Sequence, residues 1–270
     1  MIEHNESSKA TRQTIASYPG GKSNYIKHHA LYACLPDKIN LLVEPFSGLA
    51  NFYFNIYSIT KNVLLNDINV EVCSLLRVVQ DKKLLNQLIR KIQNLEPIER
   101  EEYYHWKSNN PNSVIDCAIK LLVILNCSPN GAGGGYSFEK AHRKWYRNKQ
   151  KTWFELSKRL KNAVILNEPY QDVLTDVING KTSADFIYLD PPYYDVAKKG
   201  KLYRSYDVIE WKKLLSLLEQ IRCKWLLSNR DCPEMRALFC DFYQKSYNTY
   251  NDMNNKKNNN PELLIANFKI

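Results

Sequence analysis

Short apolar segments recur along this chain, and each one ends in a polar or proline-containing loop. They occupy residues 39–44, 63–65, 164–166, 186–189 and 224–228. Stretches with helical character follow them, and the first two span residues 51–59 and 69–79. Consecutive strand, helix and strand segments normally close as right-handed crossovers, which make the strands parallel. The pattern therefore predicts an α/β fold, in which a mostly parallel sheet carries helices on both faces.

The alternation of strands and helices is interrupted between residues 80 and 155. Residues 84–95 have the spacing of an amphipathic helix, and residues 114–126 are apolar over the length of a helix. We therefore expect a catalytic domain made of residues 1–79 and 156–270, with an inserted, mainly helical domain at residues 80–155.

Charge and cysteine content limit the class of protein. The net charge of +10 indicates a polyanionic partner, most simply nucleic acid, with a basic protein lacking such a partner as the alternative. The seven cysteines include no Cys-x-x-Cys pair, so we expect reduced thiols in a cytoplasmic protein without a metal site. Residues 1–17 lack the apolar stretch of a signal peptide, and the longest apolar run, 121–125, is too short to span a membrane.

The segment Asp190-Pro191-Pro192-Tyr193 follows the predicted strand at 186–189. An amine on an aromatic base is a weak nucleophile, because its lone pair is delocalised into the ring. Its methylation requires acceptors for both N–H bonds, and the Asp190 carboxylate and a backbone carbonyl can supply them. The prolines stiffen the loop, and Tyr193 offers a flat face on which a base can stack. The alternative is a strand that ends in a Pro-Pro turn, with the tyrosine as packing.

Two other loops suit a ligand that contains a nucleoside. Ligands of open α/β sheets bind at the carboxyl ends of the strands. Residues 44–51 place Gly48 just before a helix, so the backbone can approach a ligand closely. Asp67, at the end of the second strand, can accept hydrogen bonds from two ribose hydroxyls. A helix N-cap is the alternative role for Asp67.

Several short motifs occur in a fixed order along the chain. The four most specific are Tyr18-Pro19-Gly20-Gly21-Lys22, Val43-Glu44-Pro45-Phe46-Ser47-Gly48, Leu65-Asn66-Asp67-Ile68-Asn69 and Asp190-Pro191-Pro192-Tyr193. The others are Asn126-Cys127-Ser128-Pro129-Asn130-Gly131, Leu227-Ser228-Asn229 and Glu262-Leu263-Leu264-Ile265. Together they resemble the ordered motifs of the Dam-type (D12 class) DNA adenine N6-methyltransferases, over nearly the whole chain.

This resemblance implies a Rossmann-like methyltransferase sheet with an inserted target-recognition domain. It also implies S-adenosylmethionine as methyl donor and double-stranded DNA as substrate. The residues implied to be catalytic are Asp190, Pro191, Pro192 and Tyr193. The residues implied to contact the cofactor are Tyr18, Gly21, Lys22, Glu44, Phe46, Gly48, Asp67 and Asp190.

The chain departs from the family pattern in three places. Ala50 lies in a loop that is normally richer in glycine, and Ser17 replaces the basic residue of members that recognise GATC. Residues 131–146 also differ from the recognition hairpin of those members. The resemblance therefore indicates the chemistry and leaves the target sequence open. Glu168 and Asp172 are both candidates for the acid near the cofactor adenine.

A basic, aromatic stretch inside the insertion suits contact with DNA, with a solvated helix face as the alternative. Phosphate contacts supply affinity without sequence information. The phosphate-binding candidates are Lys140, Arg143, Lys144, Arg147 and Lys149. We expect base contacts from residues 126–136, including Asn126 and Asn130.

These observations predict an enzyme that flips an adenine out of a specific duplex sequence and methylates its N6 amine. Methylation of cytosine N4 or of an RNA adenine remains an alternative. A cofactor- and DNA-binding module without turnover is a third possibility. We expect the enzyme in the cytoplasm, at the nucleoid, and a separate cognate restriction endonuclease is a candidate partner.

Overall fold

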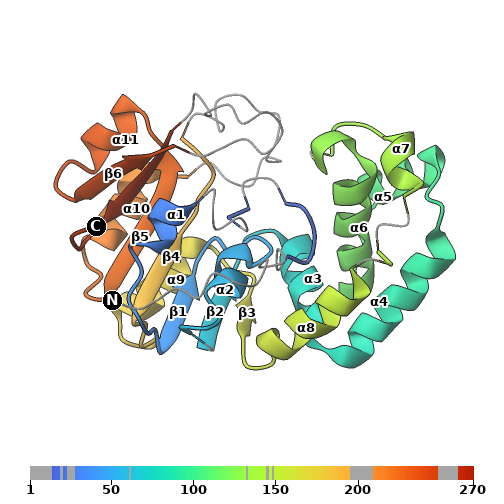
Figure 1. Cartoon of the computed structure of the whole chain (residues 1–270), viewed down its shortest axis with the longest axis horizontal. Helices are drawn as coiled ribbons and strands as arrows, with labels where there is room; N and C mark the ends of the chain where they lie inside the picture. The colour runs from blue at the N-terminus through green and yellow to red at the C-terminus, as the bar shows by residue number, and fades with distance from the viewer. Residues whose placement is uncertain are drawn as a thin grey trace.

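A computed structural model describes most of the chain (Figure 1). The described residues are 14–18, 21–22, 28–60, 62–131, 133–143, 146–147, 149–194, 209–248 and 261–270.

The described residues form one seven-stranded sheet with the order β3-β2-β1-β4-β5-β7-β6. The strands are β1 Leu41–Glu44, β2 Asn62–Asn66, β3 Val164–Leu166, β4 Phe186–Leu189, β5 Lys224–Arg230, β6 Tyr243–Tyr247 and β7 Glu262–Ala266. The first five pair in parallel, whereas β7 runs antiparallel between β5 and β6. The parallel part has the order of a doubly wound sheet, in which ligands bind where the strand order reverses.

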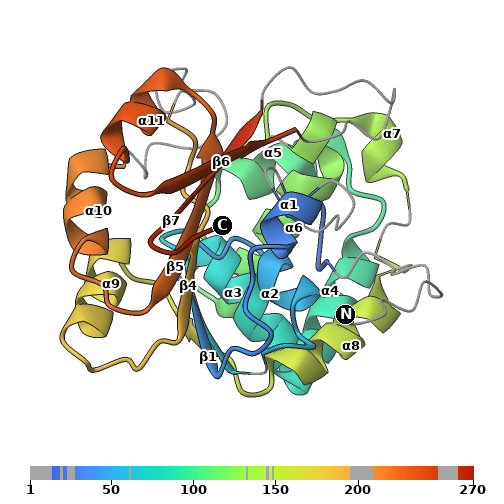
Figure 2. The same ribbon diagram turned by 60° about the vertical axis from the view of Figure 1, so that its left-hand side comes forward.

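Helices cover both faces of the sheet. The longer helices are α3 Val70–Gln80, α4 Lys82–Leu95, α5 Arg100–Ser108, α6 Val114–Cys127, α8 Gln150–Leu160, α9 Tyr170–Ile178 and α10 Trp211–Leu218. The shorter ones are α1 His29–Tyr32, α2 Asn51–Asn55, α7 Phe138–Ala141, α11 Pro233–Leu238 and the 3-10 turn η1 Pro129–Gly131. In Figure 2, α9, α10 and α11 lie on one side of the sheet, and α2 and α3 lie on the other. The predicted α/β class with helices on both faces is confirmed.

The two faces carry separate hydrophobic cores because successive strand side chains point in opposite directions. In β1, Leu42 belongs to the core under α2 and α3, and Val43 belongs to the core under α9 and α10. Leu226 and Leu227 divide in the same way in β5. Strands buried on both faces are apolar throughout, which is the pattern that the sequence shows.

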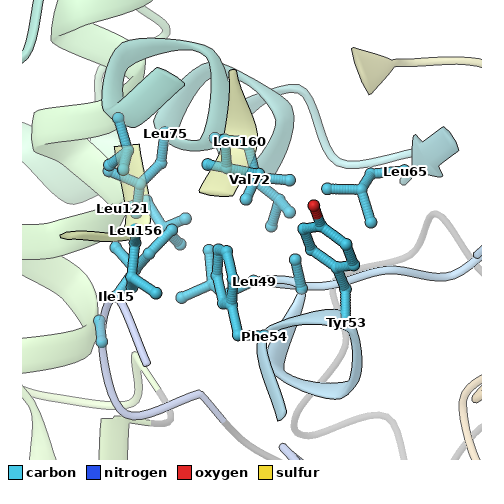
Figure 3. Packing of buried hydrophobic residues seen from close by; sticks show 14 of the residues in the cluster. Ile15, Leu49, Tyr53, Phe54, Leu65, Val72, Leu75, Leu121, Leu156 and Leu160 are labelled. Atoms are coloured by element: carbon cyan, nitrogen blue, oxygen red, sulfur yellow. The ribbon is translucent and has the colours of Figure 1, made fainter. Parts of the chain in front are cut away.

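The segment predicted as an insertion continues the larger core. Leu121 of α6 and Leu156 of α8 pack in the same cluster as Leu75 of α3 (Figure 3). A buried ion pair adds to this contact, since Nζ of Lys120 in α6 lies 2.8 Å from Oε1 of Glu71 in α3. The arrangement attaches α6 firmly to α3, and the division at residues 80 and 155 remains a prediction.

Helices α2 and α9 are two of those that differ from the sequence-based expectation. The helix expected over residues 51–59 ends at Asn55, because Ile56 leaves the helical conformation and the chain turns toward β2. Helix α9 was not predicted, because Pro169 and several polar residues mask its short apolar face. Val173 and Leu174 of that helix are nevertheless buried in the smaller core. Local patterns therefore underestimate elements whose stability comes from packing.

Candidate active site

The predicted site residues gather at the carboxyl ends of the parallel strands. Glu44 is the last residue of β1, Asp67 follows β2, and Asp190 follows β4. Ser228 lies in β5, next to β4. Because parallel strands end at the same edge of a sheet, residues from four distant segments share one region.

A buried ion pair joins the first and last of the four main motifs. Nζ of Lys22 lies 3.0 Å from Oδ1 and 3.1 Å from Oδ2 of Asp190. The Lys22 side chain is 2% exposed, and Oε2 of Glu262 lies 3.6 Å from its Nζ. The hydroxyl of Tyr32 in α1 donates to the backbone carbonyl of Lys22. The described contacts of Lys22 therefore lead to the predicted catalytic carboxylate, and its cofactor role remains a prediction.

Hydrogen bonds extend from this ion pair through Glu262. The hydroxyl of Tyr193 donates to Oε1 of Glu262 at 2.6 Å and lies 3.2 Å from Nζ of Lys22. The hydroxyl of Tyr247 donates to Oε2 of Glu262 at 3.0 Å, and Nδ1 of His28 lies 3.1 Å from that hydroxyl. The network holds the hydroxyl end of the Tyr193 ring in place, and Nζ of Lys22 lies over the ring, 5.4 Å from its centroid.

Burial and ion pairing shift the pKa values of Lys22, Asp190 and Glu262 in opposite directions. Burial alone lowers the pKa of Lys22, but Asp190, Tyr193 and Glu262 raise that pKa well above its ordinary value. Burial raises the pKa of Asp190, and this effect exceeds the lowering by Lys22. Burial also raises the pKa of Glu262, yet Lys22 and Tyr193 outweigh it, so the net shift is downward. The site thus contains one firmly charged ammonium between two carboxylates of different acidity.

Strand β5 contributes two adjacent buried side chains to the Asp190 loop. The hydroxyl of Ser228 donates to Oδ1 of Asp190 at 3.1 Å. Nδ2 of Asn229 lies 3.4 Å from the carbonyl oxygen of Pro191, and its Oδ1 accepts from the backbone of Tyr194 at 3.1 Å. The loop after β4 is therefore bound to the neighbouring strand by side chains.

Asp67 organises the loops at the ends of β1 and β2. Its Oδ2 accepts from the backbone N–H of Gly48, and its Oδ1 accepts from that of Asn69, both at 2.9 Å. Asn69 is the N-cap of α3, so the alternative capping role does not belong to Asp67. Nδ2 of Asn167 donates to the carbonyl of Asp67 at 2.8 Å.

Aromatic rings line the same loops. Gly48 has a φ of +50°, where other side chains are strained, and a Cβ there would lie 3.3 Å from Cε1 of Tyr18. A Cβ at Gly21 would lie 2.5 Å from an Asn51 side-chain atom. The rings of Phe46 and Tyr170 are 5.0 Å apart. Backbone conformation and close packing therefore disfavour larger residues at Gly48 and Gly21.

Glu44 and Asn51 each have an oxygen that remains unsatisfied. Both residues are buried, and within the described part of the chain Oε1 of Glu44 and Oδ1 of Asn51 have no hydrogen-bond partner. Burial raises the pKa of Glu44 well above its usual value, a backbone hydrogen bond from Tyr53 lowers it, and Asp190 raises it further. Buried polar atoms are normally paired, so these two oxygens are acceptors that the described residues leave for other groups.

The described phosphate-binding candidates lie around α7 and the start of α8, whereas Asn126 lies in α6 and Asn130 in η1. Arg143 is exposed and pairs with Glu139, and Arg147 is exposed beside the Tyr146 hydroxyl at 3.3 Å. The Asn126 side chain donates to the Leu122 carbonyl within α6 at 2.8 Å. Lys140 and Lys149 are half-buried, whereas Lys144 and the side chain of Asn130 lie outside the described residues.

A family model described as D12 class N6 adenine-specific DNA methyltransferase matches residues 18–255. The chain belongs to this family. It is therefore an enzyme that transfers a methyl group from S-adenosylmethionine to the N6 amine of adenine in DNA.

Two curated relatives have related names. The chain is 25% identical over 242 residues to a type II methyltransferase, M.CviBI, of Paramecium bursaria Chlorella virus NC1A, covering 86% of this chain and 90% of the relative. It is 24% identical to modification methylase StsI of Streptococcus sanguinis, covering 97% of this chain and 44% of the relative. Among solved structures, a precorrin-6y C5,15-methyltransferase from Geobacter metallireducens has a TM-score of 0.44 at 6% identity, covering 94% and 93% of the two chains.

The residues of this methyltransferase suit the cofactor. The unsatisfied oxygens of Glu44 and Asn51 can accept from an ammonium or hydroxyl group. Glu168 is the second residue after β3 and Asp172 lies in the first turn of α9, so both remain candidates for the adenine end. No helix in the described ranges is long and apolar enough to cross a membrane. Nor do the described side chains include three or more His, Cys, Asp or Glu residues grouped to hold a metal ion.

The sequence did not indicate three further residues of the methyltransferase site. They are Glu262 near Lys22, Ser228 bonded to Asp190, and Asn229 bonded to Pro191. The sequence shows the motifs that contain them but assigns these residues no role. A charged residue at the start of an apolar strand, as in Glu262-Leu263-Leu264-Ile265, was the available signal for Glu262. Its partners could not be identified, because they depend on the position of β7 beside β5.

We expect Asp67→Ala to weaken S-adenosylmethionine binding at least about tenfold and to leave DNA affinity unchanged. The variant releases the Gly48 loop and removes two acceptor oxygens. Asn69→Ala is the matched control, because it removes the N-cap of α3 at a cost of about 1 kcal/mol in folding stability. Calorimetry of cofactor binding, with thermal unfolding of both variants, checks the prediction. Equal losses of cofactor affinity in the two variants would contradict it.

Proposed function

We propose that the methyltransferase acts on an adenine turned out of a specific duplex sequence. In this proposal the Asp190 carboxylate and the Pro191 carbonyl accept the two N–H bonds of the adenine amine. The observation that carries it is the arrangement after β4, where both acceptors belong to one loop held by β5. An adenine inside a duplex cannot reach a carboxylate that is largely buried, so the base leaves its stack.

The chain's own residues then account for the reaction. Accepting both N–H bonds turns the nitrogen lone pair out of conjugation, toward the methyl group. Bound S-adenosylmethionine supplies an electrophilic methyl group on a positively charged sulfur. The N6 nitrogen gains that methyl group and releases one proton, for which ionised Asp190 is the nearest base. Tyr193 supports the ring by stacking, and Lys22 favours the ionised form of Asp190.

Base flipping is tested with duplexes in which 2-aminopurine replaces the target adenine. The target is first found by sequencing methylated DNA for N6-methyladenine, where we expect one recurring motif. Binding should then raise the fluorescence of 2-aminopurine at the target position and leave it unchanged at a neighbouring position. Equal fluorescence at both positions would contradict the proposal.

Residues 80–155 are proposed as the target-recognition domain, with residues 1–79 and 156–270 as the catalytic domain. Its described surface includes the exposed cations Arg143 and Arg147. Phosphate contacts from these residues, with Lys140, Lys144 and Lys149, would supply affinity for any duplex. The segment 126–136, including Asn126 and Asn130, would then supply contacts to bases.

Replacing Arg143 or Arg147 by Ala should weaken binding to all duplexes alike. Each lost phosphate contact lowers the slope of log affinity against log salt by about one. The matched control is Lys212→Ala, an exposed cation on α10 in the other layer. Titrations of specific and unrelated duplexes at several salt concentrations give the slopes. An arginine variant with the slope of the Lys212 variant would argue against a phosphate contact.

The names of the two relatives support a role in restriction and modification. We propose that the enzyme works on DNA at the nucleoid and protects its motif from a separate endonuclease. DNA treated with the enzyme should then resist cleavage by endonucleases that cut within that motif. Cleavage at an unchanged rate would refute the protective role.

A further inference from the structure

We propose that Ser228 and Asn229 are positioning residues that hold the two acceptors of the adenine amine in place. Ser228 holds the Asp190 carboxylate, and Asn229 holds the Pro191 carbonyl. This inference rests on the proposed roles of Asp190 and Pro191.

The hydroxyl of Ser228 has a defined direction. Its Oγ lies 3.1 Å from Oδ1 of Asp190 and 2.8 Å from the hydroxyl of Tyr188. An ionised carboxylate only accepts, so Ser228 gives its single proton to Asp190 and accepts the proton of Tyr188. Tyr188 is itself fixed, because it is 2% exposed and its ring stacks on Phe52 at 3.7 Å. The carboxylate is therefore oriented by a chain of hydrogen bonds rooted in the core.

Asn229 replaces a backbone contact that prolines cannot make. Strands β4 and β5 pair in register up to Leu189 and Leu227. Beyond them, Pro191 and Pro192 have no N–H group, so the loop cannot continue the backbone ladder. The Asn229 amide bridges this gap, with Nδ2 toward the carbonyl of Pro191 and Oδ1 accepting from the backbone N–H of Tyr194.

The same contacts show which lone pairs remain for the amine. A carboxylate has about four acceptor positions, and a carbonyl oxygen has two. In the described contacts Oδ1 of Asp190 accepts from Lys22 and Ser228, whereas Oδ2 accepts from Lys22 alone. The carbonyl of Pro191 accepts only from Asn229. The geometry therefore assigns Oδ2 of Asp190 and the second lone pair of Pro191 to the adenine.

Ser228 also affects the ionisation of Asp190. The pH dependence of the rate therefore tests its positioning role in a way that a purely structural role would not affect. The groups that face Asp190 are Lys22, Glu262, Tyr188, Tyr193 and Glu44. Burial raises the pKa of Asp190, while Lys22 and the Ser228 hydrogen bond lower it. Removing the Ser228 hydroxyl raises that pKa, so the acid limb of the rate profile moves to higher pH. Asn229 donates to an uncharged carbonyl, and its replacement leaves the limb where it is.

The experiment compares Ser228→Ala, Ser228→Cys and Asn229→Ala with the unchanged enzyme. We expect kcat to fall about 10- to 100-fold in both alanine variants. Ser228→Cys, a weaker donor of similar size, should lie between Ser228→Ala and the unchanged enzyme. Cofactor affinity by calorimetry, 2-aminopurine fluorescence and melting temperature should stay near their original values. Ser157→Ala, a buried serine of α8 that bonds to the Gln80 carbonyl, is the control and should keep full activity.

The outcomes separate this inference from the function on which it rests. Full kcat in both alanine variants, with Asp190→Asn inactive, would refute the positioning roles and keep Asp190 as acceptor. Activity in Asp190→Ala, which has no side-chain oxygen, would refute the acceptor itself. A fall in kcat matched by a loss of cofactor affinity or of folding stability would make Ser228 and Asn229 structural. An acid limb that does not move in Ser228→Ala would also make Ser228 structural.

Discussion

Asp190→Asn should lower methyl transfer by about 100- to 1,000-fold, which corresponds to about 3–4 kcal/mol of barrier. The amide keeps the shape of the carboxylate but replaces one acceptor oxygen by an N–H₂ donor. That donor would face either the ammonium of Lys22 or the amine of the substrate, both of which also donate. The lone pair of the amine would then stay in conjugation with the ring. Quantifying N6-methyladenine in treated DNA under single-turnover conditions checks this result.

Folding and binding serve as controls for this variant. Lys22 keeps Glu262 at 3.6 Å, so its charge is not left without a neighbouring carboxylate. Cofactor affinity and 2-aminopurine fluorescence should therefore remain close to those of the unchanged enzyme. Turnover within a factor of a few of the original would show that the reaction requires neither the charge nor the second acceptor oxygen of Asp190.

Lys22→Met should have the second large effect, on both activity and folding. The Lys22 ammonium is 2% exposed and lies between Asp190 and Glu262, which are 21% and 10% exposed. Methionine fills a similar volume without the charge. Breaking a buried ion pair from one side costs about 3–5 kcal/mol, because the remaining charges stay buried. Loss of the positioning contact should also lower kcat by roughly 100-fold at pH 7.

The pH dependence identifies the cause of the Lys22 effect. Lys22 lowers the pKa of Asp190, so its removal raises that pKa further above the ordinary value. Asp190 accepts an N–H bond only when ionised, so the acid limb of the rate profile moves upward. The variant should therefore lose more activity at pH 6 than at pH 9. Lys158→Met, an exposed lysine of α8 paired with Glu155, is the control and should change neither profile nor stability. A uniform loss of rate at all pH values would show that Lys22 acts through structure alone.

Local patterns in the sequence were enough for the class of fold and for the central motif. Strand segments buried on both faces are apolar throughout, and helices α3, α4 and α6 have clear periodicity and caps. Asp190 and Asp67 stand directly after such strands, and parallel strands must end at one edge of the sheet. These predictions needed no knowledge of which strand lies beside which.

Helices whose presence or length depends on packing were harder to predict from the sequence. Helix α9 is short and begins after a proline, so its burial against the sheet, rather than its own spacing, stabilises it. Helix α2 ends early because the chain turns to enter β2 beside β1. Each of these boundaries depends on distant residues.

The sequence by itself therefore determined the alternation of strands and helices, the strand-end positions of Asp67 and Asp190, and the family resemblance. Only the tertiary structure decided which side chains meet. Lys22 reaches Asp190 across 168 positions of sequence, and Ser228 reaches it because β5 pairs with β4. Glu262 joins them because β7 inserts between β5 and β6. The physical reason is that the residues following a strand are its neighbours in the sequence. The partners of a buried charge depend instead on the order of the strands in the sheet, which no local pattern encodes.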